Sequence, residues 1–120
     1  MVIQMTADVI DWPGSTGAKY RFWFIELSLA GVHRQPGAYM FVRMANQGGG
    51  WVPVYIGIAD NLVDRLTGHE RWAEAKQLGA THVMAQVQAD RTAREKAEQD
   101  LIAHWNPPLN THHRTDRMAG

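Results

Sequence analysis

Two runs of alternating apolar side chains, joined by a polar glycine-rich break, occupy the middle of the chain. Residues 37–43 and 51–57 are both rich in β-branched and aromatic residues, as short strands are. The break at 46–50 reads Asn-Gln-Gly-Gly-Gly, which favours a turn. Side chains alternate faces along a strand, so this hairpin brings Tyr39 and Tyr55 to one surface. The same alternation predicts Trp51 beside Tyr55, with the opposite, inward face formed by Val52, Val54 and Ile56.

Further strands are predicted on either side of this hairpin. Residues 2–10 form a weak strand pattern that ends in a dense turn signal at 11–17. Residues 20–27 form a stronger one, whose aromatic side chains Tyr20, Phe22 and Phe24 share a face and pack on a core. Residues 82–88 alternate apolar and polar positions, which predicts a third central strand.

Between these strands the pattern changes to a helical one. Asp60 or Asn61 can cap a helix in which Leu62, Leu66 and His69 follow at i, i+4 and i+7. Arg65 and His69, four residues apart, then share one flank of that helix. Gly68 interrupts it, and a second short helix over 70–78 ends at Gly79.

The last helix is predicted from Asp90 or Thr92 to Trp105, where Asn106-Pro107-Pro108 stops it. One face combines a polar N-terminal half with an apolar C-terminal half and consists of residues 91, 94, 95, 98, 101, 102 and 105. Glu98 lies at the junction of the two halves. By itself, this position indicates either a carboxylate paired with a nearby arginine or a functional acid.

Composition narrows the class of protein. A chain of 120 residues with 45% apolar and 20% charged residues fits one globular domain. Twelve basic residues balance twelve acidic ones, so the basic excess typical of a stand-alone nucleic-acid binder is missing. The chain has no cysteine, which excludes disulfides and thiolate metal sites. No signal peptide and no membrane span is visible, and we expect a cytoplasmic protein without a membrane partner.

Together these residues resemble a known family, the GIY-YIG nuclease superfamily. The similarity consists of Gly37-Ala38-Tyr39, Tyr55-Ile56-Gly57, Asn61-Leu62 with Arg65 and His69, Glu98-x-x-Leu101-Ile102, and Pro107-Pro108-Leu109-Asn110. Each piece alone is unspecific, but the ordered set over 36–111 is specific. The resemblance implies an α+β fold, with a three-stranded antiparallel sheet flanked by helices and preceded here by an N-terminal aromatic strand or hairpin. It divides the chain into an extension (1–35), a catalytic core (36–111) and a mobile polar tail (112–120).

The resemblance also implies roles for individual residues. Tyr39 and Tyr55 would be the paired tyrosines, one of which acts in activating the attacking water. Arg65 would hold the scissile phosphate, and His69 would assist proton transfer. Glu98 would bind the divalent metal, Asn110 would brace the site, and Gly37 and Gly57 would allow the backbone turns and close approaches of the motif.

These residue types suit phosphodiester hydrolysis independently of the family. In-line attack needs an activated water and positive charge on the phosphate oxygens. Mg²⁺ keeps most of its waters and binds through one or two carboxylates, so Glu98 is a sufficient anchor; we expect Mn²⁺ to substitute. Ionising a tyrosine near neutral pH costs about 4 kcal/mol, which Arg65, His69 and the metal could offset. Whether Tyr39, Tyr55 or His69 is the base stays open.

The chain departs from the family pattern at two positions. Ala38 stands where isoleucine or valine is usual. Ile58 stands where many relatives carry a polar residue that reaches the site, which leaves efficiency open. No DNA-recognition domain is visible, so a targeting partner or a homodimer is compatible with the sequence. DNA is the expected substrate, and RNA is not excluded.

Three other readings compete with a Mg²⁺-dependent endonuclease. A nuclease fold can persist as a catalytically weak or inactive nucleic-acid or protein binding module. The aromatic strand at 22–24 could instead be the edge of an assembly domain. His104 with His112 and His113 could ligate zinc, although their spacing fits no established zinc pattern.

Overall fold

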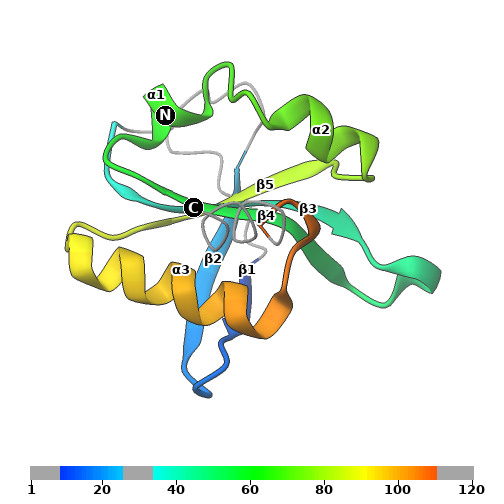
Figure 1. The fold of residues 1–120 in the computed structure, drawn as a ribbon, viewed down its shortest axis with the longest axis horizontal. Coiled ribbons are helices and arrows are strands. Elements are labelled where there is room, and N and C mark those ends of the chain that lie inside the picture. Colours follow the sequence, from blue (N-terminus) through cyan, green and yellow to red (C-terminus); the bar gives the residue numbers. More distant parts are fainter. Residues whose placement is uncertain (1–8, 26–33, 111–120) are drawn as a thin grey trace, which may run out of the picture.

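The computed structural model describes residues 9–25 and 34–110, and within them five antiparallel strands form one sheet in the order β1-β2-β5-β3-β4 (Figure 1). The strands are β1 (Val9–Pro13), β2 (Lys19–Ile25), β3 (Gly37–Met44), β4 (Trp51–Ala59) and β5 (His82–Val87). The helices are α1 (Leu62–Leu66), α2 (Trp72–Gln77) and α3 (Arg91–Trp105), and a 3₁₀ turn over Asn46–Gly48 closes the β3–β4 hairpin.

The predicted three-stranded sheet is therefore wrong in its strand number. Strands β3, β4 and β5 form the expected core, but the N-terminal hairpin joins the same sheet because β2 pairs with β5. Trp23, Phe24 and Ile25 lie opposite Ala85, Met84 and Val83 in that pairing. Without β2, strand β5 would have an unpaired apolar edge, which folded proteins avoid. The predicted aromatic face of this hairpin is confirmed, since Tyr20, Phe22 and Phe24 all pack in one core cluster.

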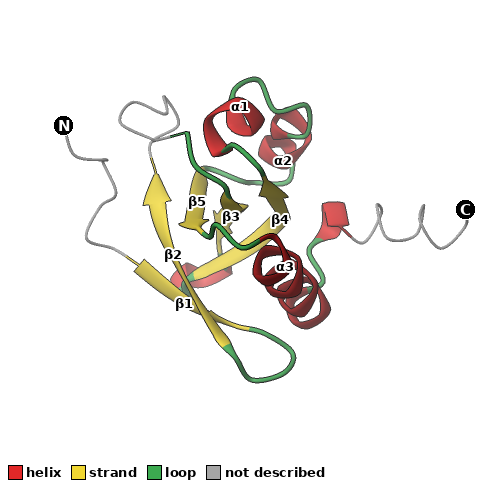
Figure 2. Ribbon diagram, turned by 90° about the vertical axis from the view of Figure 1, so that its left-hand side faces the viewer, coloured by secondary structure: helices red, strands yellow, loops and turns green. Residues whose placement is uncertain are grey.

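Helices cover both faces of the sheet. Helices α1 and α2 lie on one face and α3 lies on the other (Figures 1 and 2). The core on the α1–α2 side includes Tyr39, Phe41 and Leu62. The core on the α3 side includes Met40, Ile56 and Leu101. Because helices cover both faces, the surface that carries the tyrosines is packed and not open. The alternation alone had suggested that only the opposite face points inward.

A β-bulge in the central hairpin changes which side chains share a face. Phe41 lies opposite Tyr55, but Val42 lies opposite Pro53, so Val54 is an extra residue in β4. One inserted residue reverses the alternation beyond it. Val54 therefore packs with the tyrosines, while Trp51 packs on the α3 side against Phe24. The predicted grouping of Trp51 with Tyr55, and of Val54 with Ile56, is wrong for this reason.

The segment after α3 passes around the edge strand β4. Asn106 turns the chain with a positive φ of 47°, and Leu109 then joins the core on the α1–α2 side. Asn110 is 2% exposed, and its side chain pairs with the backbone of Ile56. Its Oδ1 accepts from the Ile56 N–H at 2.7 Å and its Nδ2 donates to the Ile56 carbonyl at 2.8 Å. An asparagine side chain thus replaces a neighbouring strand at this point of the edge.

The N-terminal hairpin is fastened to α3 by one carboxylate. Asp100, buried on α3, accepts hydrogen bonds from the Thr16 backbone N–H at 2.9 Å, the Thr16 hydroxyl at 2.7 Å and the Tyr20 hydroxyl at 2.7 Å. These hydrogen bonds hold the pKa of Asp100 below its ordinary value. The predicted strand at 2–10 lies outside the described residues except for Val9 and Ile10, as does the polar tail 112–120. Among the helices of residues 9–25 and 34–110, none is long and apolar enough to cross a bilayer.

Candidate functional site

Tyr39 occupies the centre of the site, and Gly57 makes room for it. These two residues lie opposite each other in the β3–β4 pair, and Tyr39 is 1% exposed. A β-carbon at position 57 would lie 2.5 Å from the Tyr39 hydroxyl oxygen and 2.6 Å from its ring, closer than atoms can approach. Gly37 is required in the same way, since its β-carbon would lie 2.1 Å from the Gln86 carbonyl of β5. Both motif glycines therefore have a packing reason.

His69 holds the Tyr39 hydroxyl and has a defined tautomer. The Nε2 atom lies 2.8 Å from the Tyr39 hydroxyl, and the backbone N–H of Arg71 donates to Nδ1 at 3.0 Å. A backbone N–H can only donate, so Nδ1 is the acceptor and the proton of the neutral ring sits on Nε2. His69 therefore donates to the oxygen of Tyr39. With both ring nitrogens engaged, His69 has no free lone pair with which to take a proton from water.

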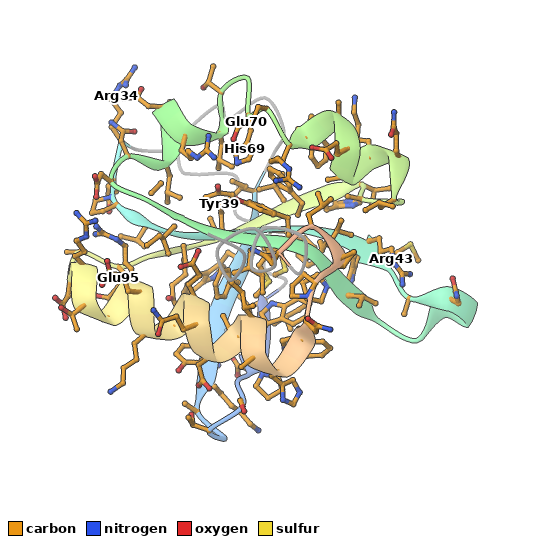
Figure 3. All side chains as sticks on the ribbon, viewed as in Figure 1. Arg34, Tyr39, Arg43, His69, Glu70 and Glu95 are labelled. Carbon is orange, nitrogen blue, oxygen red and sulfur yellow. The ribbon has the colours of Figure 1, made fainter. Side chains whose placement is uncertain are left out.

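His69 reaches this place from a loop and not from a helix. Helix α1 ends at Leu66, and Gly68 adopts a left-handed φ of 63°, a conformation that glycine adopts without steric cost. The predicted helical pairing of Arg65 with His69 at i and i+4 is therefore wrong. The loop nevertheless brings the ring over the sheet, where it packs against Tyr39, Phe41 and Tyr55. Figure 3 shows Tyr39, His69 and Glu70 on the same side of the sheet.

Tyr55 is the second phenol beside Tyr39, with ring centroids 6.2 Å apart. Burial first, and then the neighbouring Tyr55, raise the pKa of Tyr39, and the hydrogen bond between the two phenols acts in the same direction. These effects stabilise the neutral form of the Tyr39 phenol. Tyr55 is only half-buried, unlike Tyr39. The Arg71 guanidinium carbon lies 5.7 Å from the Tyr55 ring centroid, within cation–π range.

Arg65 lies beside these phenols and is held by Glu70. Its Nη1 and Nη2 donate to the two carboxylate oxygens of Glu70 at 2.9 and 2.8 Å. The hydrogen bond with Glu70 raises the pKa of Arg65, and the same bond first, with a backbone hydrogen bond second, lowers the pKa of Glu70 to about 2. Charge and hydrogen bonding from Arg65 also act to lower the pKa of Tyr39, against the larger effect of burial. Arg65 is thus a permanent cation beside the phenol pair.

Burial keeps His69 neutral. Loss of solvation, and then the positive charge of Arg65, lower its pKa to about 4, although Glu70 acts in the opposite direction. At neutral pH the ring therefore carries one proton, on Nε2. The structure places four of the predicted site residues together, namely Tyr39, Tyr55, Arg65 and His69.

Glu98 approaches from the other side of the sheet. It is half-buried on α3, which packs chiefly on β4 and lies across the sheet from α1 (Figure 1). Because β4 is the edge strand, no other strand of the sheet lies between α1 and α3 on the outer side of β4. Asn110 braces that edge at Ile56, directly between Tyr55 and Gly57. A site shared by Glu98 and the phenols would straddle this edge.

The donor set suits one kind of metal ion. Among residues 9–25 and 34–110, no group of three or more His, Cys, Asp or Glu side chains could enclose an ion. Zinc sites need three or four such ligands, whereas Mg²⁺ binds through one or two carboxylates and keeps its waters. Glu98 with a hydrated Mg²⁺ fits this pattern. Of the proposed zinc ligands, His112 and His113 lie outside the described residues.

Ile58 lies on the α3 face, away from the phenols. It lies opposite Ala38 and packs with the α3-side core. It also lines an open hollow of about 140 Å³ together with Asp60, Arg91 and Arg94. Arg94 is 4% exposed and is held there by Asp60 at 2.9 Å and by the backbone carbonyls of Gln88 and Ala89. An arginine on the predicted polar half of the helix is therefore a buried structural residue.

Two residues of the site were not predicted. Glu70 binds Arg65, and Arg71 contacts both His69 and Tyr55. The run His69-Glu70-Arg71 was available as a signal, because three consecutive ionisable residues follow a glycine after the motif arginine. Their partners depend on the path of the α1–α2 loop, which local patterns do not specify.

Comparison with solved structures finds the N-terminal GIY-YIG endonuclease domain of UvrC from Thermotoga maritima. For the form bound to magnesium as its catalytic divalent cation, the identity is 27%, the match covers 63% of this chain and 83% of that chain, and the TM-score is 0.50. A tyrosine-to-phenylalanine form gives 26%, 63%, 83% and 0.50 in the same order, and an asparagine-to-alanine form gives 27%, 63%, 82% and 0.50. Both variants are also bound to the catalytic divalent cation. No family model and no curated protein matches the sequence.

The matched domains share with this chain an α+β architecture. At 27% identity over nearly two thirds of the chain, the similarity extends beyond strand order to the sequence itself. The resemblance drawn from the motifs is therefore confirmed, and the chain is related through its fold to the GIY-YIG nucleases.

Proposed function

We propose that the protein is a Mg²⁺-dependent endonuclease that hydrolyses phosphodiester bonds of DNA by in-line attack of water. One observation carries the proposal: Tyr39 and Tyr55 lie on one face of the sheet with ring centroids 6.2 Å apart, the Tyr39 hydroxyl is held by His69 at 2.8 Å, and the guanidinium of Arg65 lies beside them. Preorganised donors and a cation next to a candidate base are the features that phosphoryl transfer requires.

Each residue has a role in this proposal. Tyr55 accepts the proton of the attacking water, since it is the more accessible of the two phenols. Tyr39 and His69 pack against the Tyr55 ring and orient it. Arg65 neutralises the nonbridging oxygens as the new P–O bond forms and one bridging P–O bond breaks.

The metal has one candidate anchor. Glu98 would hold a hydrated Mg²⁺ on the α3 side of the β4 edge, and such an ion supplies positive charge for the leaving oxygen. The UvrC domains bind a catalytic divalent cation, which supports metal use here. Asn110 would keep the backbone between Tyr55 and Gly57 in place for both halves of the site.

The test uses supercoiled plasmid and flapped or branched DNA with Mg²⁺ or Mn²⁺. We expect nicked circles first, because one such site cuts one strand per encounter. Chelation with EDTA should stop cutting and added Mg²⁺ should restore it. Glu98→Gln should abolish cutting, whereas Glu95→Gln, one turn away and paired with Arg91 at 3.2 Å, should cut like the wild type. DNA binding without cutting of any substrate would overturn the nuclease and favour a binding module.

A further inference from the structure

The cation proposed to hold the phosphate is already bound to a carboxylate of the same chain. Glu70 receives both Nη groups of Arg65 at 2.8 and 2.9 Å, as a bidentate pair. A phosphate presents the same two-oxygen edge to a guanidinium. Glu70 therefore occupies the position that a nonbridging pair of phosphate oxygens would take at Arg65.

We propose that Glu70 is an internal competitor for the anion site of Arg65 and thereby sets the affinity of the site for DNA phosphate. This inference rests on the proposed function of Arg65. It assigns a role to Glu70, which has none in the proposed mechanism. Glu70 acts on binding through Arg65 and does not touch the reacting atoms.

The surroundings of the Arg65–Glu70 pair allow an incoming anion to displace the Glu70 carboxylate. The side chains of Arg65 and Glu70 are 35% and 63% exposed, and exposed ion pairs contribute little net stability. Glu70 lies in the loop between α1 and α2, so its carboxylate can swing into solvent. The neighbouring His69 keeps its contacts with Tyr39 and Arg71 when this happens, because those contacts involve a different side chain.

Protonation cannot substitute for displacement. The hydrogen bond from Arg65 lowers the pKa of Glu70 to about 2, so the carboxylate is charged at neutral pH. Only a competing anion can take its place. The pair consequently disfavours weakly held single anions and yields to a polyanion whose other phosphates are bound elsewhere.

The test compares Glu70→Gln with the wild type in binding a fluorescent DNA duplex in EDTA, and in a titration with inorganic phosphate followed by NMR. Glutamine keeps the shape and removes the charge. We expect duplex affinity to rise roughly two- to fivefold at low salt, and the difference to shrink at high salt. Phosphate should shift the Arg65 guanidinium signal at lower concentration in the variant.

Asp11→Asn is the matched control. Asp11 forms the same kind of exposed, two-point pair with Arg21, at 2.7 and 3.1 Å, on the N-terminal hairpin. It makes the same change in net charge without touching the site, so it should raise affinity much less. In an Arg65→Gln background, Glu70→Gln should have no more effect than Asp11→Asn.

The inference is overturned if Glu70→Gln binds no more tightly than Asp11→Asn, or if its gain survives in the Arg65→Gln background. These binding readouts are independent of cleavage. Cutting by the wild type with no gain in Glu70→Gln would leave the nuclease intact and remove the competitor. If Glu70→Gln binds phosphate more tightly and the wild type never cuts DNA, the competitor role stands and the nuclease proposal fails.

Discussion

Tyr39 and Gly57 lie opposite each other across the β3–β4 pair, so closely that a β-carbon at 57 would be 2.5 Å from the phenol oxygen of Tyr39. Gly57 in one half of the motif therefore leaves the space that the side chain of Tyr39, in the other half, occupies. Because position 57 has no side chain, the Tyr39 hydroxyl can lie 2.8 Å from Nε2 of His69.

Gly57→Ala should displace the Tyr39 phenol and break its hydrogen bond with His69. Overpacking of a filled core costs about 1–3 kcal/mol, and we expect DNA cleavage to fall by at least tenfold. Thermal unfolding and plasmid nicking measure the two effects. Gly49→Ala is the control, since its β-carbon would meet its nearest neighbour only at 3.9 Å; equal effects of both substitutions would contradict the packing explanation.

Tyr55→Phe should impair cleavage more than Tyr39→Phe. Loss of a general base costs about 10²–10⁴-fold in rate, whereas loss of the Tyr39 hydroxyl only weakens the support of Tyr55. Tyr39→Phe should in turn be the less stable variant by about 1–3 kcal/mol, because it leaves the buried Nε2–H of His69 without its acceptor. Single-turnover cleavage and urea unfolding give the two orders, and a reversed order of rates would make Tyr39 the base.

Acid should destabilise the protein through His69. Burial lowers the pKa of His69 to about 4, while the unfolded chain has a histidine pKa of about 6.5. Between these values the unfolded state binds the extra proton, so stability falls as the pH drops from about 6.5 to 4, by up to about 3 kcal/mol.

His69→Gln should remove that part of the pH dependence. Urea unfolding at pH 7.5 and pH 5 measures it. The control is His104→Gln, which changes an exposed histidine on α3 and should keep the wild-type slope. An unchanged slope in His69→Gln would show that another group is responsible.

Asn110→Ala should loosen the edge of the sheet. It removes both side-chain hydrogen bonds to Ile56 and leaves a buried backbone N–H and carbonyl without partners, which costs about 2–4 kcal/mol. Hydrogen exchange of the Ile56 amide should accelerate. Cleavage should fall because Tyr55 and Gly57 are the sequence neighbours of Ile56. Asn46→Ala, at the exposed hairpin tip, should change neither. An Ile56 amide that stays protected would contradict the bracing role.

The periodicity of the sequence was sufficient to locate the central strands and α3 closely. Residues 37–43, 51–57 and 82–88 were predicted as strands and correspond to β3, β4 and β5. Gly79 ends the second helix with a φ of 99°, as its position predicted. The alternation also placed Tyr39 and Tyr55 on one face, because the register on that side of the bulge is regular.

Tertiary structure alone decided the bulge at Val54, the pairing of β2 with β5, and the loop that carries His69 and Glu70. Periodicity reports which face of its own strand or helix a side chain occupies, and this depends on neighbours a few residues away. Strand register, and the choice of Glu70 as the partner of Arg65, depend on the packing of segments distant along the chain. The ordered motif residues could be read from the sequence, whereas the hydrogen-bond chain through Tyr39 and the carboxylate on Arg65 exist only once those segments have come together.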